Sequence, residues 1–363
     1  MNIVILGLSI TSSWGNGHAT TYRALVRELA RRGHSVQFLE RDVPWYASNR
    51  DLQEWPHGRI NLYQSVADLF KSHRQAIRDA DAVIVGSYVP DGIEVGNKVL
   101  NLARGVVAFY DIDTPVTLAK LEDGTCEYVA RDQIPFYDLY LSFAGGSTLS
   151  RLEQIYGSPC AEAFYCSVDP ELYYPESIPQ EWDLGYLGTY SPDRQPGLER
   201  LLTIPASRWQ EGRFIVAGPQ YPEEIEWPPN VRRVEHLPPS RHRNFYNSQR
   251  HALNITRSDM IAAGYSPSVR LFEAAACATP VISDYWEGLE DLFQIGSEIL
   301  VARNSEEMLG YLREQPAPLA REIGRAARER VLAAHTASHR AAELESHLER
   351  LIRSMPTPIA ASI

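Results

Sequence analysis

Short apolar runs separated by helical patterns recur along the chain, and this alternation constrains its fold most strongly. The first run, at residues 3–8, is continuous and rich in β-branched residues, which is typical of a buried strand. A loop of small and polar residues follows, and then a helical pattern that stops near Gly33. The same signal predicts further strands in the first half at 36–39, 82–86, 106–110, 139–143 and 163–166.

The alternation breaks once and then restarts. Prolines at positions 170, 175 and 179 punctuate a polar segment without periodicity, which predicts a domain boundary there. Beyond it, strands are expected at 184–188, 214–218, 231–234, 252–256, 280–283 and 298–301. Helical stretches are expected at 198–209 and 269–277, and Arg/Glu/Ala-rich helices at 319–334 and 339–354.

Two α/β domains in tandem account for the length of 363 residues, which is too great for one ordinary core. Strands alternating with helices predict parallel, doubly wound, Rossmann-like sheets covered on both faces. We expect these domains at 1–178 and 179–335, and a C-terminal helix with a frayed tail at 336–363 that packs back on the domain interface. Ligands of such sheets bind outside the carboxyl ends of the strands, so a site is expected in a cleft between the halves.

Composition narrows the possible partners. The 35 Lys+Arg against 46 Asp+Glu give a net charge of −11, which argues against a large nucleic-acid footprint. Four cysteines at irregular spacing predict neither a disulfide framework nor a zinc site, so reduced thiols are expected. The apolar run at residues 3–8 is too short for a signal segment or a membrane span, and a cytoplasmic protein is expected. The oligomeric state is left open.

The most informative motif runs from Ser266 to Ser283. Ser266 and Pro267 suit the start of a helix, where the hydroxyl and N–H of Ser268 would meet a phosphate at the positive end of the helix dipole. Glu273 lies in an otherwise apolar run, and a buried carboxylate needs partners. A ribose diol would supply two donors to it. The alternative is an internal pair between Glu273 and Arg270, three residues earlier.

These residues resemble a known family. The pattern Pro-Ser-x-x-x-x-Glu-x-x-x-x-x-x-Pro-Val is similar to the donor-nucleotide motif of GT-B glycosyltransferases, and the fuller pattern resembles the CgeB-like (spore-maturation-protein type) members. That fuller pattern, over about residues 1–310, comprises 110–115 (Tyr-Asp-Ile-Asp-Thr-Pro), 137–143 (Tyr-Asp-Leu-Tyr-Leu-Ser-Phe), 168–170 (Val-Asp-Pro), 186–190 (Tyr-Leu-Gly-Thr-Tyr) and, most specific, 270–277 (Arg-Leu-Phe-Glu-Ala-Ala-Ala-Cys). Such families usually carry Gly where this chain has Ala278.

The resemblance implies a fold, a donor and roles for three residues. It implies the GT-B fold, with two Rossmann-like domains facing across a cleft, and a nucleotide diphosphate-sugar donor, for which a UDP-sugar is favoured over GDP or dTDP. Glu273 would hold the ribose, and Ser268 with Val269 would meet the diphosphate. No metal and no further cofactor are expected, because arginines and helix N-termini can stabilise the leaving diphosphate.

Arginines near predicted strand ends are candidates for the diphosphate. The turn at Gly188-Thr189 is either a plain βα connection or, with Arg194, a pyrophosphate site. Arg257 follows the strand expected at 252–256, and Arg270 is the third candidate. Sequence reasoning does not rank these three arginines.

The loop Gly15-Asn16-Gly17-His18 fails as a dinucleotide fingerprint, because Thr20 replaces the third glycine. It is similar to the glycine-rich first loop of GT-B enzymes, which faces the reacting sugar and the acceptor. His18 at a helix N-terminus would have a lowered pKa and would suit a general base. The alternative is a helix-start histidine that bonds locally.

Other candidates for the acceptor side lie at the strand expected at 106–110. Asp111 and Asp113 follow it and would share a side of the chain, and Asp113 is the second choice for the base. An Asp-capped turn before Thr114 is the alternative. Their Asp-x-Asp spacing also occurs in a metal motif of single-sheet glycosyltransferases, an interpretation that the tandem pattern disfavours. The residues expected to contact the acceptor are Trp14, Gly17, Tyr110 and Asp111, with packing as the alternative role for the tryptophan.

Taken together, the residues predict a metal-independent glycosyltransferase with a small-molecule donor and an unidentified acceptor. A sugar-nucleotide epimerase or hydrolase of the same fold is one alternative, and a non-catalytic binding protein is the other. The stereochemical outcome stays open, since a base at position 18 suits inversion whereas the Glu273 motif is commonest among retaining enzymes.

Overall fold

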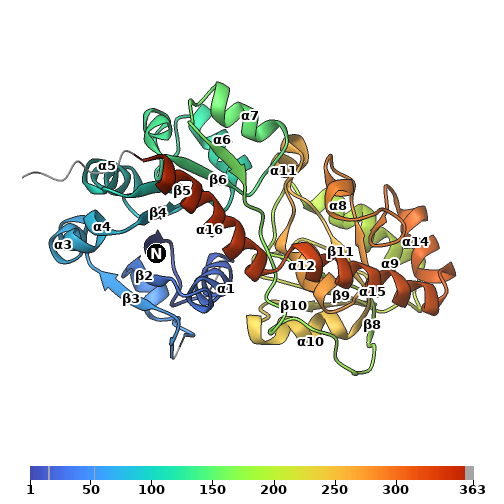
Figure 1. Ribbon diagram of the computed structural model, residues 1–363. Coiled ribbons are helices and arrows are strands. Elements are labelled where there is room, and N and C mark those ends of the chain that lie inside the picture. Colours follow the sequence, from blue (N-terminus) through green and yellow to red (C-terminus); the bar gives the residue numbers. More distant parts are fainter. Residues whose placement is uncertain (15–16, 53, 356–363) are drawn as a thin grey trace, which may run out of the picture. The chain divides into compact units, whose positions relative to one another are not determined.

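The computed structural model describes residues 1–14, 17–52 and 54–355 (Figure 1). The chain divides into two compact units. Unit 1 comprises Met1–Tyr165 together with the segment that starts at Ala337, and unit 2 comprises Cys166–Thr336. The sequence-based division was placed after residue 178, and the proline-punctuated segment that motivated it lies within unit 2.

Unit 1 contains, among the described residues, a seven-stranded parallel sheet in the order β3-β2-β1-β4-β5-β6-β7. The strands are β1 Asn2–Gly7, β2 Ser35–Arg41, β3 Arg59–Tyr63, β4 Ala82–Gly86, β5 Val106–Asp111, β6 Leu139–Ser142 and β7 Ala161–Ala163. The helices are α1 His18–Arg31, α2 Pro44–Ala47, α3 Val66–Ser72, α4 Arg74–Asp79, α5 Gly92–Leu102, α6 Thr114–Glu122, the 3-10 turn η1 Arg131–Phe136, α7 Ser147–Gln154 and α16 Ala337–Ser354.

Two apolar layers cover this sheet. Helices α3, α4, α5 and α7 contribute to the core on one face, where Leu69, Ile77 and Val99 pack with Val83 and Phe109. The other face carries α1 and α16, which contact each other (Figure 1). Glu345 of α16 accepts a hydrogen bond from Arg32 just after α1 (Nε, 2.8 Å). The predicted C-terminal helix therefore exists, and it packs on α1 of unit 1.

Unit 2 has a six-stranded parallel sheet within the described residues, in the order β10-β9-β8-β11-β12-β13. The strands are β8 Trp182–Leu187, β9 Phe214–Ala217, β10 Val231–Val234, β11 Gln249–Asn254, β12 Val281–Ser283 and β13 Leu300–Val301. The helices are α8 Gln195–Leu198, the π-helical η2 Glu199–Thr203, α9 Ile204–Arg208, the 3-10 turn η3 Pro239–Arg241, α10 His242–Asn247, α11 Ser258–Ala263, α12 Val269–Ala276, α13 Leu289–Leu292, α14 Ser305–Glu314 and α15 Ala317–Ala334.

Both sheets share one topological feature that positions ligands. In each unit the strand order reverses beside the unit's first strand, between β1 and β4 in unit 1 and between β8 and β11 in unit 2. Open α/β sheets bind ligands at such switch points, outside the carboxyl ends of the strands. The loops that follow β1, β4, β8 and β11 are therefore where functional side chains are expected.

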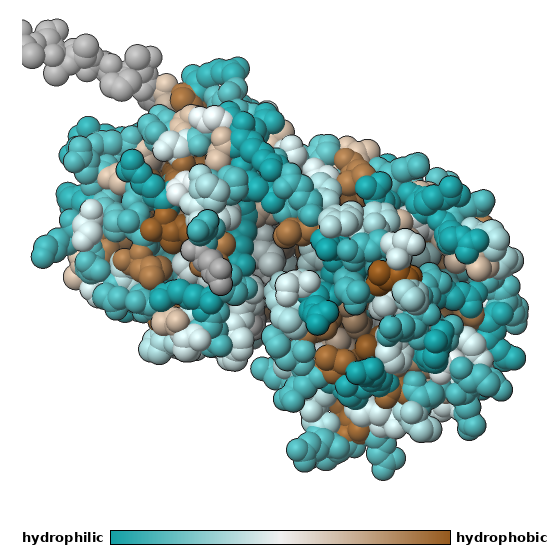
Figure 2. Space-filling model, turned by 90° about the horizontal axis from the view of Figure 1, so that it is seen from below, coloured by the Kyte–Doolittle hydropathy of each residue, from teal (hydrophilic) through white to brown (hydrophobic). Residues whose placement is uncertain are grey.

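No helix in the described part of the chain is long and apolar enough to cross a membrane. On the face shown in Figure 2, hydrophobic residues form separate patches among hydrophilic ones. Large apolar side chains that are at least half exposed include Trp14, in the loop after β1, and Trp45, in the short helix α2 after β2. Scattered exposed apolar residues are normal for a folded protein, and those two are notable only for their position.

Candidate functional site

Arg270 organises the switch point of unit 2. Its side chain rises from the first turn of α12 and is only 8% exposed. The guanidinium donates from Nε to the carbonyl of Leu187, at the end of β8, and from Nη1 to Oδ1 of Asn254, at the end of β11 (2.8 Å). Its Cζ also lies 4.8 Å from the centre of the Tyr186 ring. Arg270 thus joins the two strands that flank the switch point.

Glu273 lies one turn further along α12 and is 7% exposed. The hydroxyl of Tyr246 donates to its Oε2 (2.9 Å), and Tyr173 lies nearby, with its hydroxyl 3.4 Å from Nδ1 of His242. The pKa values of the Tyr173 and Tyr246 phenols are raised, mainly by burial and secondly by the negative charge of Glu273. Among the ion pairs of the described residues there is none between Glu273 and Arg270, so the internal pair considered from the sequence is not formed. The carboxylate instead accepts from the phenol of Tyr246, an interaction that a hydroxyl of a diol can imitate.

The three candidate arginines gather at this edge of the sheet. Arg194 donates from Nη2 to the carbonyl of Thr189 (2.6 Å), while its buried Nε has no hydrogen-bond partner among the described residues. The pKa of Arg194 is lowered, first by burial and then by the nearby charges of Arg270 and Arg257, against an opposing contribution from Tyr186. Neighbouring positive charges, one of them on the buried Arg270 and two on the half-buried Arg194 and Arg257, favour the binding of an anion.

The remaining predicted donor residues line the same edge. Ser268 is the N-cap of α12, makes no side-chain cap bond, and accepts a weak contact from Arg270 Nη1 (3.4 Å); Val269 is the first helical residue. A Cβ at Gly188 would lie 2.6 Å from the hydroxyl of Tyr186, so the turn after β8 requires glycine. Their N–H groups are at the end of a helix or in a turn, where anions bind.

Sequence reasoning missed a second layer of polar groups behind the arginines. Asp284, after β12, is buried and accepts from the N–H of Thr256 (2.9 Å) and from its hydroxyl (2.7 Å). Asn254 donates from Nδ2 to the hydroxyls of Thr256 and Ser283. Burial raises the pKa of Asp284, although its hydrogen bonds and Arg270 oppose that shift. The signal in the sequence that could have found these groups is that polar residues end otherwise apolar strands.

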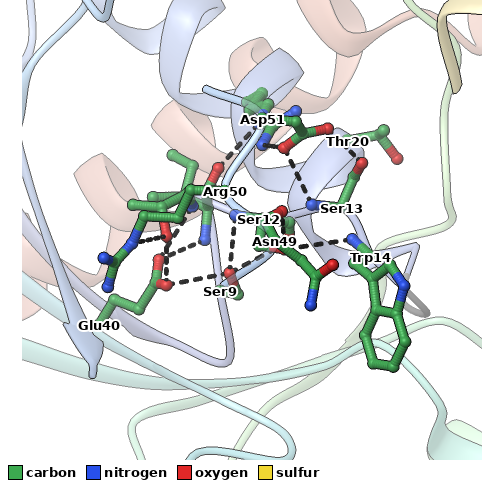
Figure 3. A network of polar contacts seen from close by, with 12 residues as sticks. Ser9, Ser12, Ser13, Trp14, Thr20, Glu40, Asn49, Arg50 and Asp51 are labelled. Atoms are coloured by element: carbon green, nitrogen blue, oxygen red, sulfur yellow. Dashed lines mark hydrogen bonds and ion pairs between the residues drawn. The ribbon is translucent and has the colours of Figure 1, made fainter. Parts of the chain in front are cut away.

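In unit 1, a buried carboxylate organises the loop after β1. Glu40, in β2, is fully buried and accepts from the N–H groups of Ile10 (2.7 Å) and Thr11 (3.0 Å). Its other oxygen accepts from the hydroxyls of Ser9 (3.0 Å) and Thr11 (2.6 Å). Figure 3 shows this network and the half-exposed indole of Trp14, which extends away from it. Glu40 therefore holds the first part of the loop that presents Trp14 through four hydrogen bonds.

A second group of contacts extends the same network. Asp51 accepts from the N–H of Ser13 (3.1 Å), from the Ser13 hydroxyl and from Arg23 (Figure 3). Beyond it, Gly15 and Asn16 of the predicted glycine-rich loop lie outside the described residues. Gly17 is exposed and precedes α1 as its N-cap.

His18 begins α1 and is half-buried. Burial lowers its pKa to about 4, so the imidazole is neutral at pH 7. Its Nδ1 has no hydrogen-bond partner among the described residues, which disagrees with the alternative of a locally bonded histidine. The ring instead meets the edge of Tyr88, with centroids 5.5 Å apart and planes at 81°. A neutral imidazole whose Nδ1 lacks a partner among the described residues can accept a proton from a bound substrate.

Two of the four residues predicted to contact an acceptor are in the interior. Tyr110 is buried and packs against Tyr22, Phe143 and Phe164. Asp111 is 0% exposed, and its carboxylate accepts from Tyr140 (2.6 Å) and Thr117 (2.8 Å). They are the last residues of β5, whose whole length is buried, so their sequence position at the strand end was misleading.

Asp113 differs from Asp111 in both exposure and role. It is half-buried, is the N-cap of α6, and accepts from the hydroxyl of Tyr88 (3.0 Å). Its own N–H donates to Asp111 (3.2 Å), so the two carboxylates do not share a side of an extended chain. The buried carboxylate of Asp111 thus stabilises the turn before α6, and the carboxylate of Asp113 is the more exposed of the two.

Asp111→Asn is expected to stabilise the protein increasingly as the pH rises. Burial raises the pKa of Asp111 to about 6 from 3.8, so this carboxyl favours folding below pH 3.8 and loses that contribution as the pH rises through 6. Asparagine keeps Oδ1 for Thr117 and avoids the buried charge, which predicts a gain approaching about 2–3 kcal/mol above pH 6. Urea unfolding of both proteins at pH 4 and pH 8 measures it; a gain that is independent of pH contradicts the prediction.

A separate cavity of about 570 Å³ lies at the opposite edge of the unit 2 sheet. Gln249 and Arg250, which begin β11, line it together with Pro280 before β12 and the start of α15. It is thus at the amino ends of the strands, away from Arg270. Within the described residues, no group of three or more His, Cys, Asp or Glu side chains is arranged to hold a metal ion.

Comparison with known proteins adds independent findings. Residues 194–346 match the model of a family described as glycosyl transferase-like. A sucrose-phosphate synthase from Thermosynechococcus elongatus has a similar structure, with a TM-score of 0.71 and 14% identity over 98% of this chain and 100% of that one. The fold is the GT-B fold. No curated protein matches the sequence.

Two further structures share the GT-B fold over nearly the whole chain. Anabaena HepE in complex with UDP-glucose has a TM-score of 0.71 and 13% identity over 97% of this chain and 100% of that one. An α-glucosyltransferase in complex with UDP-glucose and DNA containing an abasic site has a TM-score of 0.73 and 14% identity over 96% and 99%. The two units are therefore the two Rossmann-like domains of this fold, and the match to the glycosyl transferase-like model covers residues 194–346.

Proposed function

We propose that this protein is a glycosyltransferase that moves a sugar from a UDP-sugar to a small-molecule acceptor, and that it is of the CgeB-like type. The observation that carries the proposal is the cluster of Arg194, Arg257 and Arg270 at the switch point of a GT-B domain, beside the buried Glu273. Sugar transfer releases a diphosphate, and preorganised positive charge stabilises the negative charge that develops on it.

The donor would bind along the carboxyl edge of unit 2. The diphosphate would accept from the arginines and from the N–H groups of Thr189, Ser268 and Val269, because the N–H of Gly188 already donates to the carbonyl of Ala217 (2.9 Å). The ribose diol would donate to Glu273 in place of a phenol hydroxyl. The UDP and UDP-glucose in the structures of similar fold support UDP as the nucleotide.

The acceptor would bind to unit 1. His18, neutral at pH 7, would remove the proton from the acceptor hydroxyl, and Asp113 is the second candidate for that base. Trp14 and Gly17, both exposed at the loop after β1, would contact the acceptor, whereas Tyr110 and Asp111 would not. An indole that extends from a braced loop suits stacking on the apolar face of a sugar.

The reaction would need no metal ion, because the three arginines supply the positive charge. Activity is therefore expected to persist in EDTA. Loss of activity in EDTA that Mn²⁺ or Mg²⁺ restores would contradict the metal-free mechanism while leaving sugar transfer itself intact.

The deciding experiment measures UDP binding and turnover separately. Calorimetric titration with UDP is expected to give an affinity that Glu273→Ala weakens by about tenfold or more, since a buried carboxylate that binds two hydroxyls is lost. His18→Ala is expected to keep UDP affinity and to lower the turnover of UDP-glucose with a sugar acceptor panel by about 100-fold or more.

Three outcomes would contradict the proposal. Unchanged UDP affinity in Glu273→Ala would remove the donor-site assignment. Release of UDP without any glycosylated product would favour a hydrolase or an epimerase. UDP binding without any turnover would favour a binding protein.

A further inference from the structure

Tyr88 occupies the second loop of the unit 1 switch point, directly after β4. Its backbone has φ +62°, and Asp91 in the same loop has φ +55°. A bulky residue with positive φ is an outlier, because its Cβ crowds the backbone. Such strain persists where surrounding contacts enforce it, and it is concentrated at functional sites. The contacts that enforce this conformation therefore indicate the role of the Tyr88 side chain.

The side chain contacts both predicted catalytic residues. Its hydroxyl donates to Oδ2 of Asp113 (3.0 Å), at the start of α6. Its ring meets the His18 imidazole edge-on, at 5.5 Å between centroids, at the start of α1. On its other sides lie the ring of Tyr128 (4.5 Å between centroids) and the ammonium of Lys120 (5.0 Å from the ring centre). One tyrosine thus connects two helices that begin at the switch point.

We propose that Tyr88 is a positioning residue that orients His18 as the general base, with Asp113 fixing the Tyr88 hydroxyl. This role rests on the proposed function. His18 Nδ1 has no hydrogen-bond partner among the described residues, so packing has to set the angle of the ring. Bases whose proton acceptor is aligned with the substrate react faster than freely rotating ones, even at the same pKa.

The contact also maintains the protonation state that a base requires. The titratable rings that face His18 in the described structure are those of Tyr22 and Tyr88, and neither carries charge at pH 7. Burial lowers the pKa of His18, and the rings of Tyr22 and Tyr88 are among the groups packed against it. Removal of the Tyr88 ring would admit water, and the imidazole would return toward its ordinary pKa of 6.5.

Tyr88→Gly and Tyr88→Phe separate the ring from the hydroxyl. Glycine accepts the positive φ without steric cost and removes the side chain, whereas phenylalanine keeps the ring. Tyr88→Gly is expected to lower kcat by about 10- to 100-fold with the KM for UDP-glucose within about twofold. Tyr88→Phe is expected to lose about threefold to tenfold, and Tyr88→Phe combined with Asp113→Ala to be no slower than Asp113→Ala alone.

Two measurements distinguish positioning from a structural role. NMR titration of the His18 ring, assigned with His18→Gln, needs no substrate. The pKa of His18 is expected to move from about 4 toward 6.5 in Tyr88→Gly and to stay at about 4 in Tyr88→Phe. The acidic limb of the pH profile of kcat/KM should move with the pKa of His18. As the pH falls, Tyr88→Gly should therefore lose activity at a higher pH than the wild type does. Tyr311→Phe, which removes one hydroxyl bond to Val301 in unit 2, is the control and should change neither.

An active wild-type protein whose His18 titration is unchanged in Tyr88→Gly would overturn the role of Tyr88 alone. Multiplicative losses in the double variant would overturn it too, because the hydroxyl and the carboxylate would then act independently. Wild-type protein that turns over no nucleotide-sugar would instead overturn the proposed function, and the positioning role with it.

Discussion

Arg270→Ala is expected to lose both stability and UDP affinity. The substitution leaves the carbonyl of the half-buried Leu187 and Oδ1 of the buried Asn254 without the guanidinium donor. It also removes the packing of the guanidinium on Tyr186. Together these changes should lower the free energy of unfolding by about 2–4 kcal/mol. UDP affinity should fall by about 10- to 100-fold, since a charged hydrogen bond to the diphosphate is lost.

Urea unfolding and calorimetric titration with UDP measure these two effects on the same protein. Arg328→Ala is the matched control: this half-buried arginine of α15 donates to the carbonyl of Ala276, in the same unit but away from the strand ends. It should cost less than about 1 kcal/mol and leave UDP affinity unchanged. An Arg270→Ala protein that binds UDP like wild type would show that Arg270 serves the fold alone.

Glu40→Gln is expected to open the loop after β1. The carboxylate accepts four hydrogen bonds, and an amide has one oxygen and an NH₂ group that would face the N–H groups of Ile10 and Thr11. Leaving buried donors unpaired should cost about 2–4 kcal/mol. Hydrogen exchange at Ile10 and Thr11 should accelerate, and transferase activity should fall because Trp14 and His18 adjoin this loop.

Glu28→Gln provides the comparison, because Glu28 is also nearly buried in unit 1 but pairs with the side chains of Arg27 and Arg31. It is expected to cost less than about 1 kcal/mol and to leave the loop amides protected. Equal losses in the two variants would mean that buried charge in general, rather than the Glu40 network, stabilises unit 1.

The strands were largely predictable because parallel sheets leave continuous apolar runs. The prediction matched β4 and β10 in full and came within a few residues elsewhere, but it missed β3. That strand, Arg59–Tyr63, lies at the sheet edge and alternates Arg, Asn and apolar residues, with only Tyr63 buried. The expected helix at 198–209 proved to contain the π-helical turn Glu199–Thr203, which precedes Pro205. Edge strands and irregular turns lack the periodicity on which such predictions depend.

The donor half of the site was more predictable than the acceptor half. Strand ends meet at one edge of a parallel sheet, and so the sequence placed Arg194, Arg257 and Arg270 close together. Tyr110, which was expected to contact the acceptor, is buried because the end of β5 is covered. Tyr88 was missed because no motif marks it: its importance depends on a backbone conformation and on two partners from distant segments.

The pairing of α16 with α1 has a consequence for how the protein is made. A ribosome completes residues 1–165 and then all of unit 2 before it synthesises the helix that covers the α1 face of the first sheet. Until then Leu344 and Leu348 are absent from that face, and the nascent first half exposes apolar surface to chaperones. Unit 2 is continuous, and it closes where Val168 and Thr336 pair, so it can finish folding first. Helix α16, which follows unit 2 in the sequence, therefore completes the covering of the sheet in unit 1.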